Sequence, residues 1–271
     1  MQFTHRYVPA LGREVHRLGL ACNYGIDTAG FAEGLERGIN TIFWTSMRTG
    51  HLKGTLRSAL ANDRARHVLL AGPMLGYFGG SLRRGVERLL KDLNTDYLDV
   101  LMLFWLGKGS ALTAGTIEAA NKLKDEGKIR ALGTSIHDRV RAGELALDSP
   151  IDLFMLRYNA AHPGAERDVF PHLHKRNPAV LAYTATAWRK LFKTPSDWSG
   201  PPMSAGDCYR FCLSSPHVDM TLTGPANAVQ LRESLAALER GPLSSEEETY
   251  IRAFGTRVHG SSLLSQTGVV L

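Results

Sequence analysis

The chain has 271 residues, of which 44% are hydrophobic, so it is long enough to bury one large core. No apolar run reaches the roughly 18 residues that a membrane helix needs, and the first ten residues lack an apolar signal segment, which together predict a cytoplasmic protein. The formal charge is +6, but the Lys and Arg residues are spread along the chain without interleaved aromatic residues. This dispersal argues against a nucleic-acid surface. A basic surface could equally serve to bind an anionic small ligand.

Three cysteines, Cys22, Cys208 and Cys212, are too few for a disulfide framework, which fits a reducing compartment. Cys208 and Cys212 lie four residues apart, which is a helical spacing, and no further Cys is near them. We expect these two thiols to be buried as small hydrophobic groups rather than to bind a metal ion.

In chain order, apolar runs typical of buried strands alternate with stretches of helical periodicity. Phe3–Tyr7 and Pro9–Gly12 predict a hairpin that feeds the first strand. The predicted strands are Val15–Leu20, Asn40–Phe43, Val68–Ala71, Tyr97–Phe104, Ile129–Thr134, Ile151–Leu156, Ala179–Tyr183 and Val218–Leu222. The predicted helices are Thr28–Arg37, His51–Ala61, Ser81–Leu93, Thr113–Glu126, Val140–Leu147, Ala165–Lys175, Asp207–Leu213, Ala228–Leu238 and Ser245–Val258.

Continuous apolar strands separated by helices indicate parallel strands that are covered on their outer side. Eight such strands close a (β/α)8 barrel. The predicted fold class is therefore an α/β TIM barrel with an N-terminal β-hairpin and a C-terminal helix, in which residues 1–271 form a single domain. Such barrels work at the carboxyl ends of their strands, so we expect the chemistry just after each strand.

Five segments carry a resemblance to a known family. The first, GINTIFWTSMRTG (38–50), is followed in order by NTDYLDVLML (94–103), LKDEGKIRALGTS (123–135), VLAYT (180–184) and GPANAVQLRESL (224–235). In this order and at these spacings, they resemble the signature segments of the aldo/keto reductases. The resemblance implies a barrel that binds a nicotinamide cofactor and reduces carbonyl groups with a catalytic tetrad of Asp, Tyr, Lys and His.

All four tetrad positions are replaced in this chain. Aligned on the family's pattern, Trp44 stands in place of the Asp, Thr49 in place of the Tyr, and Phe104 in place of the His. Pro73 stands in place of the Lys, with Gly72 the near alternative. The family's Tyr protonates the alkoxide as the hydride arrives, and none of these replacements can do so at neutral pH. We therefore do not expect standard carbonyl reduction, and we expect Trp44 and Phe104 to lie side by side as an aromatic wall at the mouth.

The resemblance also implies a site for NADP(H) whose two ends differ. The positions that match the family's cofactor-binding residues are Ser135, Tyr183, Thr184, Arg189, Gly224, Gln230 and Glu233. Two residues that would hold the nicotinamide amide are replaced, the Asn by Ile136 and the Gln by Met155. We expect a passable adenosine–phosphate site and a weakened nicotinamide site.

Other polar residues gather after the fifth and sixth predicted strands. His137 follows the fifth strand, and Arg157, Tyr158 and His162 follow the sixth, and we take these four as candidate catalytic residues. A buried Arg at a strand end needs a carboxylate partner or an anionic ligand, and a His can titrate near neutral pH. The alternatives are that Arg157 is neutralised by Glu166 and that His162 caps a helix. We do not expect a metal site here, because the loop spacing of His137, His162 and Glu166 does not specify one.

Three functions remain open at this stage. The first is an atypical enzyme of this family that acts on a small, anionic or carbonyl-bearing molecule at the barrel mouth without the standard tetrad. The second is a residual NAD(P)(H)-dependent oxidoreductase. The third is a non-catalytic ligand-binding or regulatory barrel. Fold alone cannot separate them, because barrels support many chemistries.

Overall fold

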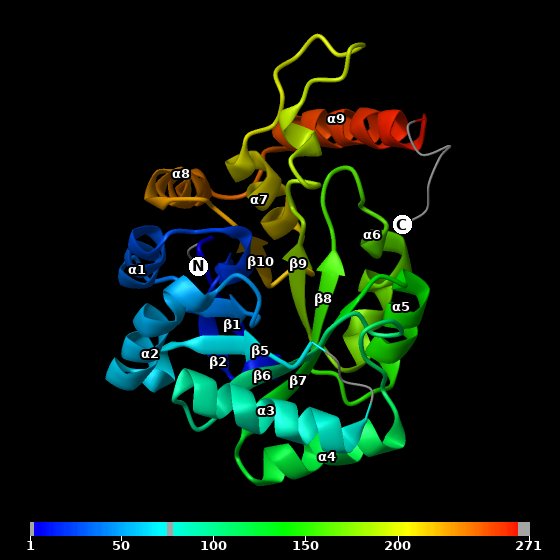
Figure 1. Cartoon of the computed structure of the whole chain (residues 1–271). Helices are drawn as coiled ribbons and strands as arrows, with labels where there is room; N and C mark the ends of the chain where they lie inside the picture. Colours follow the sequence, from blue (N-terminus) through cyan, green and yellow to red (C-terminus); the bar gives the residue numbers. More distant parts are fainter. Residues whose placement is uncertain (1–2, 75–77, 265–271) are drawn as a thin grey trace.

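The computed structural model describes residues 3–74 and 78–264, and its centre is a closed barrel of eight parallel strands (Figure 1). Around the barrel the strands follow one another in sequence order, with β10 closing against β3. They are β3 (Leu18–Ala21), β4 (Thr41–Trp44), β5 (Val68–Ala71), β6 (Leu98–Leu103), β7 (Ile129–Ile136), β8 (Leu153–Arg157), β9 (Ala179–Tyr183) and β10 (Met220–Thr223). The predicted (β/α)8 fold class is confirmed.

Helices cover the outer face of the barrel, as expected for parallel strands. They are α1 (Thr28–Glu36), α2 (Lys53–Asn62), α3 (Gly79–Leu93), α4 (Ala114–Asp125), α5 (Arg139–Leu147), α6 (Ala165–Asp168), α7 (Ala205–Ser214), α8 (Ala228–Glu239) and α9 (Ser245–Leu264). The longest, α9, crosses one end of the molecule, beside α7 (Figure 1). No helix within the described ranges is long and apolar enough to cross a bilayer.

One predicted helix is wrong in its extent. The periodicity of residues 165–175 predicted a single helix, but α6 ends at Asp168 and a 3-10 helix runs over Phe170–Lys175. Pro171 explains the break, because proline has no N–H to donate and its ring clashes with the carbonyl group four residues earlier. The chain leaves helical geometry at Val169, where φ is −128°.

Strand alternation divides the apolar residues into two sets. The inward set fills the barrel and includes Leu70, Val100, Met102, Leu153 and Leu181. The outward set, which is larger, packs against the surrounding helices. The hairpin of β1 (His5–Val8) and β2 (Arg13–His16) joins the inward set through Val8 and Val15, so it closes one end of the barrel. The opposite end remains available for a site.

A buried carboxylate ties the hairpin to the barrel. Asp99 on β6 is only 3% exposed, and it accepts hydrogen bonds from the Leu69 N–H at 2.9 Å, from Arg64 Nη2 at 2.8 Å and from Arg13 Nη1 at 3.1 Å. Since Arg13 belongs to β2 and Leu69 to β5, one side chain links the hairpin and two strands. Such a buried group contributes stability only while all its partners are present.

We expect Asp99→Asn to lower the free energy of unfolding by about 2–4 kcal/mol, because the neutral amide leaves two half-buried arginines, Arg13 and Arg64, without their buried counter-charge. Urea unfolding measures this loss. The matched control is Asp92→Asn, whose side chain is 39% exposed and pairs with Lys53 on the surface; it should cost less than about 1 kcal/mol. Equal effects of the two substitutions would show that Asp99 does not hold the hairpin.

Candidate functional site

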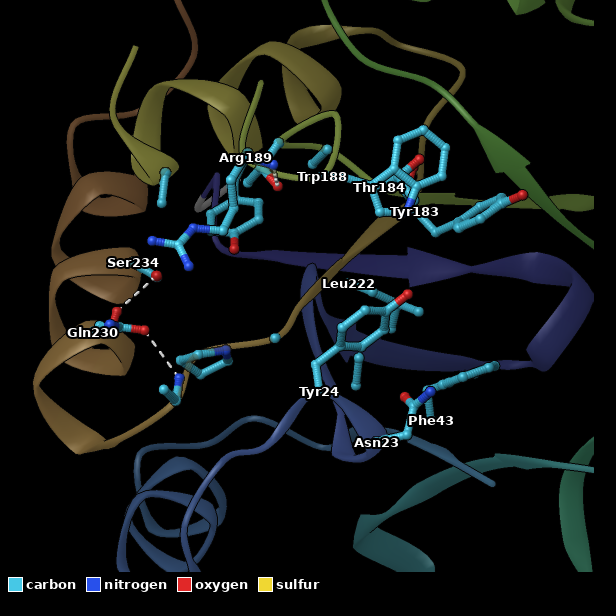
Figure 2. Close-up of a pocket in the computed structure, with 18 of the residues that line it drawn as sticks. Asn23, Tyr24, Phe43, Tyr183, Thr184, Trp188, Arg189, Leu222, Gln230 and Ser234 are labelled. Atoms are coloured by element: carbon cyan, nitrogen blue, oxygen red, sulfur yellow. Dashed lines mark hydrogen bonds between the residues drawn. The ribbon is translucent and has the colours of Figure 1, made fainter. Parts of the chain in front are cut away.

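A cavity of about 770 Å³ opens at the carboxyl ends of the strands and extends to α8. Its inner part is lined by apolar side chains that continue the barrel core, among them Phe43, Phe104, Met155 and Leu222. Its outer part is lined by the loop that follows β9 and by the first turns of α8. Figure 2 shows Tyr24 between these regions, with Gln230 and Ser234 on the α8 side. A long cavity with one apolar and one polar end is suited to an extended ligand.

Every residue predicted for cofactor binding lines this cavity. They come from β7, β9, the loop after β9, the loop after β10, and α8, and are Ser135, Tyr183, Thr184, Arg189, Gly224, Gln230 and Glu233. The fold thus brings together positions that lie up to a hundred residues apart. Their roles toward a ligand remain a prediction.

The loop after β9 has an unusual backbone. Four of its residues that are not glycine have positive φ: Thr184 (53°), Ala187 (48°), Trp188 (54°) and Arg189 (67°). Each such residue costs about 1 kcal/mol, so the loop is held in a conformation that the chain does not favour locally. Strain of this kind is often found at ligand sites.

This loop presents hydrogen-bond donors without protein partners. Among the described residues, the guanidinium of Arg189 and the backbone N–H groups of Ala185 and Thr186 make no hydrogen bond to the protein. Figure 2 shows the Arg189 side chain directed across the cavity, toward Gln230 and Ser234 on α8. Successive free N–H groups next to a guanidinium are suited to phosphate oxygens.

The aromatic wall at the mouth exists, but one of its two predicted members is wrong. Phe43 and Phe104 line the cavity with their rings edge to face and their centroids 5.7 Å apart. Trp44 is 1% exposed and packs in the outward set, between the strands and the helices. Because side chains alternate along a strand, an alignment error of one residue transfers the prediction to the opposite face. Thr41 faces the barrel interior, where its hydroxyl contacts Met220. The two-residue period of the strand therefore predicts that Phe43 faces inward as well.

The other two replaced positions also point away from the cavity. Thr49 is buried, and its Oγ1 donates a hydrogen bond to the Thr45 carbonyl at 2.7 Å. Pro73 packs against α3: a Cβ added to Gly85 on that helix would lie only 2.6 Å from the Cβ of Pro73. At Gly72 a Cβ would lie 2.0 Å from the Met102 carbonyl oxygen, so this backbone admits only glycine. No lysine side chain can start from Gly72 without moving β6.

His137 and Arg157 lie at the mouth, as predicted, although neither lines the main cavity. They continue the inward rows of β7 and β8, two residues beyond Ser135 and Met155. Arg157 is paired in register with Tyr183 on β9. The Tyr183 hydroxyl lies 3.2 Å from Nδ1 of His137. Burial and then the charges of Arg157 and Lys108 lower the pKa of His137.

Tyr158 and His162 do not line the cavity, and Tyr158 faces away from the mouth. Tyr158 is 1% exposed and stacks on Phe211, and its hydroxyl donates to Glu166 Oε1 at 2.6 Å. Burial and then this carboxylate raise the pKa of Tyr158. His162 packs edge to face on His259, and burial lowers its pKa to about 4, so it is neutral near pH 7. As the residue next to Arg157 on an alternating strand, Tyr158 necessarily faces the other way.

Glu166 does not neutralise Arg157, which was the alternative interpretation. It pairs with Arg252 at 2.8 Å and accepts the Tyr158 hydrogen bond. Within the described ranges no group of three or more His, Cys, Asp or Glu side chains is placed to hold a metal ion. Cys208 and Cys212 are buried in α7, as expected.

Comparison with known proteins shows which family the chain resembles. A family model described as the aldo/keto reductase family matches residues 71–197. Methylglyoxal reductase YeaE of Escherichia coli is 28% identical over 186 residues, covering 66% of this chain and 65% of that protein. L-galactose dehydrogenase of Arabidopsis thaliana is 23% identical over 200 residues, covering 62% of this chain and 61% of that protein. In sequence the chain is similar to the aldo/keto reductase family, whose model covers 127 of its 271 residues.

Solved structures of aldo/keto reductases share the fold over nearly the whole chain. The holo form of AKR11C1 from Bacillus halodurans superposes with a TM-score of 0.75 at 21% identity, covering 93% of this chain and 96% of that one. An aldo-keto reductase from Klebsiella pneumoniae in complex with NADPH gives a TM-score of 0.72 at 23% identity, covering 94% and 96%. By contrast, the sequence matches span less than two thirds of the length of each curated relative named above.

We expect Tyr158→Phe to lower the free energy of unfolding by about 1 kcal/mol, because the hydrogen bond of the buried Tyr158 hydroxyl to Glu166 is lost, while Oε1 of that half-buried carboxylate keeps its bond from Arg252. Ligand binding in the cavity should not change. Tyr7→Phe, at a side chain that is 58% exposed, is the matched control and should leave stability unchanged. Unchanged stability of Tyr158→Phe together with a loss of ligand binding would return Tyr158 to the functional site.

Proposed function

We propose that the chain is a member of the aldo/keto reductase family that binds NADP(H) in the long cavity and acts as an atypical oxidoreductase on a small, anionic or carbonyl-bearing molecule at the mouth. The observation that carries the proposal is the cavity itself. It joins all seven predicted cofactor residues to an apolar mouth built by Phe43 and Phe104. The name of the relative from E. coli, methylglyoxal reductase, supports a small carbonyl compound as substrate.

The polar end of the cavity fits the phosphate groups of a dinucleotide. Arg189 supplies a permanent positive charge, and the N–H groups of Ala185 and Thr186 supply donors in the same loop. On α8, Gln230 accepts from the Ala226 N–H through Oε1 at 2.9 Å, which fixes its amide at the cavity wall. Ser234 instead donates to the Gln230 carbonyl. When bound, NADPH would supply the hydride for reduction.

The apolar end of the cavity offers a nicotinamide fewer polar contacts than the polar end offers the phosphate groups. Tyr183 offers its ring, and Ser135 offers a hydroxyl that already accepts the Trp105 N–H at 2.8 Å. Met155 brings a thioether where the family has an amide. The ring would therefore be held mainly by packing, which supports a weakened grip on the nicotinamide.

The mouth also supports the proposal that proton transfer by the family's tyrosine is absent. Phe43, Phe104 and Met155 carry no ionisable proton. Burial raises the pKa of Tyr183 to about 12 and of Tyr209 to about 12, and it raises the pKa of Tyr24 as well. The family depends on a tyrosine of tuned acidity, and raised values act in the opposite direction.

A non-catalytic ligand-binding barrel is the second candidate. The composition of the cavity wall favours this candidate, since the described lining contains no His, Lys or Asp. The two candidates agree on dinucleotide binding and differ on hydride transfer. Single-turnover oxidation of bound NADPH by a carbonyl compound would decide for the enzyme.

We expect NADPH to bind with a Kd of about 10 μM or tighter, measured by fluorescence titration. Arg189→Met should weaken binding about tenfold or more, because a charge-assisted bond to phosphate is lost. Arg88→Met, at an exposed side chain on α3, removes the same charge elsewhere and should have no effect. No NADPH binding by the unmodified protein would refute the proposed cofactor.

We further expect that turnover with NADPH on ordinary aldehydes and ketones stays well below the ~1–10 s⁻¹ that is common among enzymes. The physical reason is the lack of an acidic group next to the aromatic wall. A steady-state assay on a panel of neutral carbonyl compounds measures this. A turnover in this common range on any compound of the panel would show that a proton donor of the standard kind is present.

A further inference from the structure

Three residues at the mouth form an arc on adjacent strands. Below them, Ser135 on β7 and Met155 on β8 are register partners that line the cavity. His137 and Arg157 are the next inward-facing residues, two positions further along each chain segment. Arg157 is the register partner of Tyr183 on β9. Strand alternation therefore places His137, Arg157 and Tyr183 together, one layer above the floor of the cavity.

Among the described residues, no carboxylate balances the charge of Arg157. Within the described ranges, its guanidinium forms no ion pair or hydrogen bond, and the nearby carboxylate of Glu166 is taken by Arg252. A second cation, Lys108, acts together with Arg157 to lower the pKa of His137, after the larger effect of burial. A half-buried guanidinium without a counter-ion is costly unless a ligand supplies the negative charge.

The arc adjoins the main cavity through two shared side chains. Tyr183 and Trp188 line the cavity. The hydroxyl of Tyr183 lies 3.2 Å from His137, and the Arg157 Cζ lies 6.0 Å from the centroid of the Trp188 ring. Trp188 is 53% exposed although it is large and apolar. A ligand group bound on Arg157 would thus be flanked by an indole ring and would lie next to the cavity.

We propose that His137, Arg157 and Tyr183 form an oxyanion-binding subsite that selects substrates carrying a carboxylate or phosphate group. Arg157 pairs with the oxyanion, Tyr183 and His137 supply hydrogen bonds, and Trp188 shields the pair from water. The rest of the substrate then extends into the cavity toward Phe43 and Phe104. The selection of a substrate rests on the proposed function, whereas the anion site itself does not need the cofactor.

The test is calorimetric titration of the protein without cofactor, using oxamate, its neutral amide oxamide, and inorganic phosphate as probes. We expect an oxyanion to bind with a Kd of about 1 mM or tighter and oxamide not to bind. Preference between oxamate and phosphate decides which oxyanion the subsite takes. Each titration is repeated in the Arg189→Met protein, in which a phosphate bound at the other end of the cavity would be lost.

Arg157→Met should weaken oxyanion binding at least tenfold, while the control Arg88→Met should leave it unchanged. His137→Asn, at an exposed position, should weaken it about threefold and serves if Arg157→Met does not fold. The proposal is overturned if the unmodified protein binds neither anion, if oxamide binds as well as oxamate, or if the variants bind as tightly as the unmodified protein. NADPH titration of the same samples is independent: loss of NADPH binding alone refutes the cofactor and leaves the subsite standing.

Discussion

The two-residue period of strands in a closed parallel barrel is the constraint on which the site depends. Each strand sends alternate side chains inward, so the mouth receives every second residue at the carboxyl ends. Closure prevents a strand from sliding by one residue without exchanging its buried faces. The layer of Ser135 and Met155 and the layer of Arg157 and Tyr183 follow from this register. Register alone selects which side chains face a ligand there.

The side chains selected in this way favour binding and orientation over acid–base chemistry. An arginine keeps its charge at every accessible pH, so Arg157 can attract and align an anion without exchanging a proton. A tyrosine such as Tyr183, whose pKa burial raises to about 12, donates a hydrogen bond but little acidity. Phe43 and Phe104 line the same cavity as Tyr183 with apolar rings, and electrostatic contacts are stronger in apolar surroundings than in water.

Most of the fold, and the grouping of the seven residues proposed for the cofactor, could be predicted from the sequence. Continuous apolar strands gave the barrel, and short motifs gave seven residues that all line the cavity. The errors have specific physical causes. Alignment to the family's motif predicts Trp44 at the mouth, because a shift of one residue changes the match to the motif very little. The two-residue period of the strand instead assigns that place to Phe43. Pro171 ended a helix that the apolar periodicity alone extended.

The partners of charged side chains could not be predicted in the same way. Glu166 lies nine residues from Arg157 in sequence, yet it pairs with Arg252 from α9. Such pairings depend on how distant elements pack, and the local sequence carries no signal for them. The unpaired state of Arg157 became visible only when α9 was in place. It is therefore a result of tertiary structure that the strand pattern alone could not give.

The strained loop after β9 links the two ends of the cavity. Tyr183 begins it beside His137, Trp188 lies over Arg157, and Arg189 faces α8. Four residues with positive φ store about 1 kcal/mol each, which the surrounding contacts must offset. Anchoring Arg189 on a phosphate would restrict the backbone next to Trp188, and so would an anion held under Trp188 by Arg157. Both proposed ligands would contact the same six residues, 184–189, so the two proposed sites share one strained segment of backbone.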